Sequence, residues 1–344
     1  MLFRTHLLSL ALLACLLTGC SGSTPPAAAP SAAPSPLPAL PPTISQASTP
    51  VQPALPSATV SASPTWTATL TPTLASTPTP TPSLTITIAV IGDFGLAGKP
   101  LEDVANLIKS WQPDLVITTG DNNYPDGEAS TIDQNVGAYF QQWIFPYTGQ
   151  YGPGAQENRF FPTLGNHDWT AQHAQPYLDY FTLPGNERYY DFTWGPVHFF
   201  AIDADSREPD GVGASSIQAS WLKERLAAAP EPWKLVYFHQ APYSSGTHGP
   251  VDWMRWPFAD WGATAVLSGH DHIYERLQIG GIPYMVNGVG GGPIYDFSTP
   301  SEGSLVRFRE DYGAQRILAS PSTMVFQFFT RTGQLIDELI LNQP

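Results

Sequence analysis

Short apolar runs rich in β-branched and aromatic residues recur along the chain from Leu84 onward, and each ends in small or polar residues. Runs of about four to eight such residues are typical of buried strands. The clearest are residues 85–91, 115–119, 197–202, 235–238 and 265–268. Helical spacing appears between several of them, notably in residues 101–111 and in residues 215–229, where Ser215 and Ser216 are possible caps. This alternation predicts a layered α/β fold.

The C-terminal part has a more antiparallel character. Residues 323–330 and 334–341 read as two strands that flank the turn sequence Arg331-Thr332-Gly333, so we expect a closing hairpin. Together with the earlier runs this predicts one folded domain, residues 84–344.

The N-terminal residues have the features of a secretory signal sequence. A short basic start around Arg4 precedes a mainly apolar stretch, residues 7–17, that is too short for a stable membrane span. The sequence Leu17-Thr18-Gly19-Cys20 resembles the lipobox of bacterial lipoproteins. That resemblance implies a signal peptide at residues 1–19 and a lipid on Cys20, which anchors the protein to the membrane. We therefore expect an extracytoplasmic protein, lipid-anchored to the bacterial cell envelope; the alternative is an ordinary signal peptide with a chance cysteine.

A spacer follows the signal. Residues 21–83 contain no Lys, Arg, Asp or Glu and consist largely of Pro, Ser, Thr and Ala. Such a composition cannot bury enough apolar surface to offset its ordering entropy. We expect residues 20–83 to be a disordered linker.

The net charge and the number of cysteines exclude some functions and some means of stabilising the fold. The formal net charge of −14 argues against a nucleic-acid binding face, because such faces are basic. The chain has 2 cysteines, Cys15 and Cys20, so the folded domain has no disulfide of its own. The positive charge needed to bind an anionic substrate would therefore have to come from a bound metal ion.

Polar clusters follow the predicted strands. They are residues 92–95 (Gly-Asp-Phe-Gly), 120–124 (Gly-Asp-Asn-Asn-Tyr), 165–168 (Gly-Asn-His-Asp), His239, and 269–272 (Gly-His-Asp-His). In open α/β sheets ligands bind beyond the carboxyl ends of strands, so we expect these clusters to converge on one site.

The converging side chains are candidate metal ligands. They offer the carboxylates of Asp93 and Asp121, a phenol, an amide, and the imidazoles of His239, His270 and His272. This oxygen and nitrogen mixture suits two hard or borderline ions such as iron, zinc or manganese. Asp121 is the natural bridge, because a carboxylate can present one oxygen to each ion.

Taken in order, these blocks resemble the calcineurin-like metallophosphoesterases of the purple acid phosphatase type. The family pattern is Asp-x-Gly, Gly-Asp-x-x-Tyr, Gly-Asn-His-Glu/Asp, Val-x-x-His and Gly-His-x-His, and all five blocks occur between Asp93 and His272. The resemblance implies a β-sandwich flanked by helices. It also implies acid phosphatase activity, in which a metal-bound hydroxide at a binuclear centre hydrolyses a small phosphomonoester.

The resemblance also assigns ligands. It implies that Asp93, Tyr124 and His272 hold Fe(III) together with bridging Asp121, and that Asn166, His239 and His270 join Asp121 around Zn, Mn or Fe(II). The phenolate of Tyr124 is the ligand that would colour the protein.

Two histidines are candidates for the proton donor to the leaving group. His167 lies beside Asn166, and His248 lies in the loop 244–249, where the resemblance places a substrate-facing histidine. The bland alternatives are an orienting role for His167 through Asp168 and an exposed loop position for His248. Rival functions are a phosphodiesterase or nucleotidase on the same metal core, or a surface lipoprotein that binds without turnover.

Overall fold

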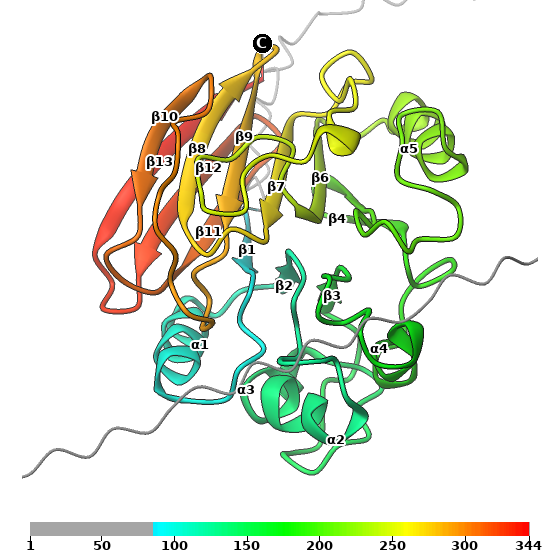
Figure 1. Cartoon of the computed structure of the whole chain (residues 1–344), viewed down its shortest axis with the longest axis vertical. Helices are drawn as coiled ribbons and strands as arrows, with labels where there is room; N and C mark the ends of the chain where they lie inside the picture. Colours follow the sequence, from blue (N-terminus) through cyan, green and yellow to red (C-terminus); the bar gives the residue numbers. More distant parts are fainter. Residues whose placement is uncertain (1–84, 344) are drawn as a thin grey trace, which may run out of the picture. The chain divides into compact units, whose positions relative to one another are not determined.

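The computed structural model describes residues 85–343, which form two mixed β-sheets with flanking helices (Figure 1). The expected signal peptide, the linker and the lipidation site Cys20 lie outside the described residues. Within residues 85–343, none of the helices has the length and apolar character needed to cross a bilayer.

One sheet has 6 strands in the order β13-β12-β11-β1-β2-β3. β1, β2 and β3 run parallel, and the remaining neighbours pair antiparallel. The predicted C-terminal hairpin is confirmed as β12 paired with β13. The strands span Ile86–Ile91 (β1), Leu115–Thr118 (β2), Phe160–Pro162 (β3), Gly313–Ala319 (β11), Thr323–Thr330 (β12) and Leu335–Asn342 (β13).

The other sheet has 7 strands in the order β10-β8-β9-β7-β6-β5-β4. β5, β6, β7 and β9 run parallel to one another, whereas β4, β8 and β10 pair antiparallel with their neighbours. The strands span Tyr190–Trp194 (β4), Val197–Ala201 (β5), Trp233–Gln240 (β6), Ala265–Gly269 (β7), Tyr274–Ile279 (β8), Ile282–Asn287 (β9) and Ser304–Phe308 (β10).

Both predicted helices form, with shifts of one or two residues at their ends. α1 spans Lys99–Trp111 and α5 spans Ile217–Ala228. The hydroxyl of Ser216 accepts a hydrogen bond from the backbone N–H of Ala219 at 3.0 Å, which caps α5 as the sequence predicts. The shorter helices are Ala129–Ile132 (α2), Ala138–Phe140 (α3) and Gln175–Tyr180 (α4).

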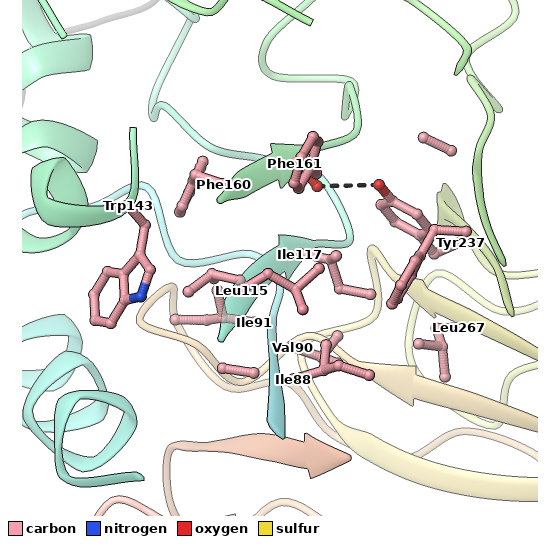
Figure 2. Close-up of a cluster of buried hydrophobic side chains, with 14 of the residues drawn as sticks. Ile88, Val90, Ile91, Leu115, Ile117, Trp143, Phe160, Phe161, Tyr237 and Leu267 are labelled. Atoms are coloured by element: carbon pink, nitrogen blue, oxygen red, sulfur yellow. Dashed lines mark hydrogen bonds between the residues drawn. The ribbon is translucent and has the colours of Figure 1, made fainter. Parts of the chain in front are cut away.

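The main core lies between the two sheets (Figure 2). Along β6, Leu235 and Tyr237 belong to this core, whereas Val236 and Phe238 pack with α5 in a second one. The hydroxyl of Tyr237 donates to the carbonyl of Phe161 at 3.2 Å, which links the sheets. Strands covered on both faces have continuous apolar runs, and this is why the sequence pattern found them. The predicted layered α/β fold, a β-sandwich flanked by helices, is confirmed.

Candidate metal centre

The five polar clusters meet at the carboxyl ends of β1, β2, β3, β6 and β7. The predicted convergence is therefore confirmed. His239 differs slightly from expectation, because it lies within β6, one residue before the strand ends.

One set of side chains gathers around Tyr124. Ligand atoms of Asp93, Asp121 and His272, all buried, lie within 4.8 Å of one another. The phenolic oxygen of Tyr124 is 3.0 Å from Oδ2 of Asp121, 3.4 Å from Oδ1 of Asp93 and 3.0 Å from Nε2 of His272. Two carboxylates, a phenol and an imidazole thus surround one small space, as a hard cation requires.

A second set gathers around His239. Its Nε2 lies 3.0 Å from Oδ1 of Asn166 and 3.2 Å from Nδ1 of His270. The same Nε2 is 3.4 Å from Oδ2 of Asp121. Oδ2 of Asp121 therefore borders both sets, which is the position that a bridging carboxylate needs.

Backbone carbonyls orient two of the histidines. Nδ1 of His239 donates to the carbonyl of Thr119 at 2.8 Å, and Nδ1 of His272 bonds the carbonyl of Pro293. Each bond leaves Nε2 facing the other candidate ligands. Metal-ligating histidines commonly donate their second ring nitrogen in this way, so the donor set fits a pair of ions.

Strained backbone carries several of these side chains. Asp93, Asp121 and His270 have φ angles of 53°, 52° and 72°, a region that non-glycine residues seldom adopt and that clusters at functional sites. Gly120, with φ of 89°, packs so tightly that a Cβ there would lie 2.7 Å from Nδ1 of His239. Glycine is therefore required before Asp121.

The pKa shifts of these buried side chains also favour the binding of a cation at the site. Burial, followed by the charges of Asp121 and Asp93, raises the pKa of Tyr124 well above its ordinary value. A positive ion among these oxygens would reverse that effect and allow the phenol to lose its proton. Burial, together with the neighbouring His239 and His248, lowers the pKa of His270 to about 2. Despite burial, the charges of Asp121 and Asp93 raise the pKa of His239 to about 10, so His239 would have to release a proton to bind a metal ion.

His167 lies on the open side of the site. Its backbone N–H donates to Oδ1 of Asp121 at 2.9 Å, and its ring packs against that of Tyr124 with centroids 4.5 Å apart. Its Nδ1 bonds the carbonyl of Pro125. Asp168, which we considered as its orienting partner, instead accepts hydrogen bonds from Asn122 and the backbone of Gly165. Both roles considered for His167 stay predictions.

His248 also reaches the site. Its ring stacks on that of His270, with centroids 4.4 Å apart and an interplanar angle of 26°. The structure thus brings all nine residues predicted from the sequence together, while their individual roles as ligands or proton donors remain predictions.

Sequence reasoning missed two residues at this site. Tyr295 stacks on His272 with ring centroids 4.0 Å apart and meets the ring of His248 edge-on at 5.2 Å. The glycine-rich residues 288–292 come just before it, but no sequence motif marks Tyr295 itself. Arg207 forms a forked ion pair with Asp205 and donates to the backbone carbonyl of Asn166 at 2.8 Å. No sequence motif marked it.

Comparisons with known proteins agree with this geometry. A family profile described as calcineurin-like phosphoesterase matches residues 86–274. Tartrate-resistant acid phosphatase type 5 from Oryctolagus cuniculus is 30% identical over 307 residues, covering 73% of this chain and 89% of that protein. The Mus musculus protein of the same name is 27% identical over 246 residues, covering 60% of this chain and 72% of that protein.

A solved structure shares the fold. Purple acid phosphatase PPD1 from yellow lupin (Lupinus luteus) seeds superposes with a TM-score of 0.62 at 19% identity. The match covers 76% of this chain but only 54% of the lupin chain. At this identity the likeness concerns the fold alone.

Proposed function

This chain belongs to the calcineurin-like phosphoesterase family and has purple acid phosphatases among its homologues, and from this premise we propose that it is an acid phosphatase that hydrolyses phosphomonoesters. The observation that carries the proposal is the position of Asp121, whose Oδ2 lies between the phenol of Tyr124 and the imidazole of His239. One side of this carboxylate offers a phenol and an imidazole, and the other side offers two imidazoles. The two sides therefore suit two unlike ions.

Each ion would have its own ligands. Asp93, Tyr124 and His272 would hold Fe(III), and Asn166, His239 and His270 would hold Zn, Mn or Fe(II), with Asp121 shared between them. When bound, such a pair supplies positive charge to the phosphoryl oxygens and lowers the pKa of a water.

The chain's own side chains would handle the leaving group. His167 and His248 border the site from two different loops, so either could give a proton to the departing ester oxygen. The carbonyls of Thr119 and Pro293 keep two of the imidazoles turned inward.

The test compares two substrates. The purified protein, loaded with iron and then with zinc or manganese, is offered 4-nitrophenyl phosphate and bis(4-nitrophenyl) phosphate at acid pH. We expect faster cleavage of the monoester. Faster cleavage of the diester would move the function to phosphodiesterase, and metal binding without phosphate release would identify a binding protein.

We also propose that the protein works outside the cytoplasm on small phosphorylated compounds, held to the cell envelope by a lipid on Cys20. The sequence Leu17-Thr18-Gly19-Cys20 supports this. In the native bacterial host, Cys20→Ser should move the protein from the detergent phase to the aqueous phase. Unchanged partitioning would refute the anchor.

A further inference from the structure

The loop 244–249, which carries His248, lies on a buried carboxylate. Asp271 accepts hydrogen bonds from the hydroxyl of Ser244 at 2.5 Å, from the backbone N–H of His248 at 2.7 Å and from that of Gly249 at 3.1 Å. Gly246 approaches so closely that a Cβ there would lie 2.3 Å from Cγ of Asp271. Asp271 itself stands between the candidate ligands His270 and His272 in the sequence.

A second buried carboxylate holds the start of the same loop. Glu275, on β8 and fully buried, accepts from the backbone N–H of Ser245 at 2.7 Å and from its hydroxyl at 2.5 Å. Burying a carboxylate is costly unless hydrogen bonds compensate for the lost hydration. For both Asp271 and Glu275 those bonds come from this one loop, so the two acids and the loop stabilise each other.

The opposite side of the loop is fixed by the segment after Tyr295. The hydroxyl of Thr247 donates to the carbonyl of Asp296 at 2.9 Å, and the backbone N–H of Ser298 donates to the carbonyl of Ser245 at 2.7 Å. Tyr295 contacts the ring of His248 edge-on. The loop is thus held from both sides, with the imidazole of His248 against His270.

We propose that Glu275 and Asp271 are positioning residues that hold His248 within reach of the leaving oxygen of the substrate. The inference rests on the proposed phosphatase function. As water adds to phosphorus and the ester P–O bond breaks, His248 gives its proton to the leaving oxygen and later regains one from solvent. A poor leaving group such as an alkoxide needs this proton, whereas dinitrophenolate leaves without it.

Glu275→Gln is the primary variant, tested in the metal-loaded full chain. With ethyl phosphate, kcat should fall about 10-fold to 100-fold, less than the full contribution of a general acid. With 2,4-dinitrophenyl phosphate, kcat should stay within about 2-fold, with KM and bound metal unchanged. Glu224→Gln, at an exposed position on α5, is the matched control and should change neither rate.

A double variant separates positioning from general damage. If Glu275 acts through His248, adding Glu275→Gln to His248→Ala should cost no further activity on ethyl phosphate. Additive losses, or equal losses on both substrates, would overturn the proposal. If Glu275→Gln does not fold, Ser245→Ala takes its place. It removes the hydroxyl contact with Glu275 and also the bond that this hydroxyl accepts from the backbone N–H of Ser301 at 2.8 Å.

Hydrogen exchange tests the positioning without any turnover. Amides of residues 244–249 should exchange at least about 10-fold faster in Glu275→Gln than in the wild type, because the loop would open more often. Unchanged exchange would refute the positioning role. If the wild type cleaves no monoester at all, the proposed function fails, and the exchange result still decides whether Glu275 holds the loop.

Discussion

Oδ2 of Asp121 lies 3.0 Å from the phenolic oxygen of Tyr124 and 3.4 Å from Nε2 of His239. A single carboxylate oxygen therefore borders a phenol on one side and an imidazole on the other. The two sides offer different ligand chemistry, harder around Tyr124 and softer around His239. This asymmetry allows the two proposed ions to be tested one at a time.

Tyr124→Phe should remove the visible colour of the iron-loaded protein. The phenolate is the ligand whose charge transfer to Fe(III) would absorb visible light, and phenylalanine keeps the ring but lacks the oxygen. Absorption spectra and iron content measured on the same sample check this. Iron should remain at or somewhat below one equivalent, because Asp93, Asp121 and His272 are still present.

Tyr295→Phe is the matched control for the colour test. Tyr295 stacks on His272 but is not among the proposed ligands, so its variant should keep the visible band. A Tyr124→Phe protein that remained coloured would show that the chromophore lies elsewhere.

His270→Ala should release the divalent ion and lower activity by at least about 100-fold. Loss of a residue that only supports a ligand costs up to about 100-fold, so loss of a ligand itself should cost at least that much. Its Nδ1 lies 3.2 Å from Nε2 of His239, within the second ligand set. Metal analysis should find iron retained and zinc or manganese lost. His173→Ala, at an exposed position, should leave both metals and the activity unchanged; normal turnover by His270→Ala would refute the ligand assignment.

Local patterns predicted the elements that are buried on both faces. β1, β2 and β5 to β7 appear as apolar runs because a core covers each side, and α5 was visible through the Ser216 cap. β11 was missed. It pairs with β1, far away in the sequence, and nothing local to residues 313–319 marks that partner.

The candidate site was predictable to a similar extent. Each ligand cluster directly follows or ends a strand, so the parallel pairing of β1 and β2 brings Asp93 and Asp121 together, and packing of the two sheets adds His270 after β7. Tyr295 and Glu275 could not be recognised, because both contact the irregular loop 244–249, which packs against them only in the tertiary fold. Such packing follows from the tertiary fold and leaves no periodic pattern in the sequence.

Tyr237→Phe should lower the free energy of unfolding by about 1 to 2 kcal/mol. The hydroxyl of Tyr237 on β6 donates to the carbonyl of Phe161 on β3 in the buried space between the sheets (Figure 2). The variant removes this buried hydrogen bond and keeps the ring. Urea denaturation checks the value, and Tyr151→Phe, at an exposed position, should change stability by less than about 0.5 kcal/mol.

His198 lies outside the metal centre and should make the stability of the folded protein depend on pH. Nε2 of His198 is 2.7 Å from Asp191, and Nδ1 is 2.9 Å from Glu231. Burial opposes its charge, but the hydrogen bonds to Asp191 and Glu231 outweigh burial and raise the pKa of His198. Arg225 pairs with the same Asp191.

The sign follows from linkage. Because the pKa of His198 is higher in the folded state, its contribution is complete below about pH 6.5, the ordinary histidine value, and is lost as pH rises through the folded-state pKa. The pKa values of Asp191 and Glu231 are lowered despite burial, by hydrogen bonds that include those with His198. Their contribution is present above the ordinary carboxyl values and is lost at lower pH. The cluster should therefore stabilise the fold most between about pH 5 and pH 6.

His198→Gln separates this effect from every other titration in the protein. Glutamine retains hydrogen-bonding groups but cannot carry the charge, so the melting temperature of the variant should fall less than that of the wild type between pH 6 and pH 9. Only the difference in slope matters, because loss of the ring stacked on Phe200 shifts the whole curve. Parallel curves for the two proteins would show that His198 has the same pKa in the folded and unfolded states, and the ion pairs would then contribute no pH-dependent stability.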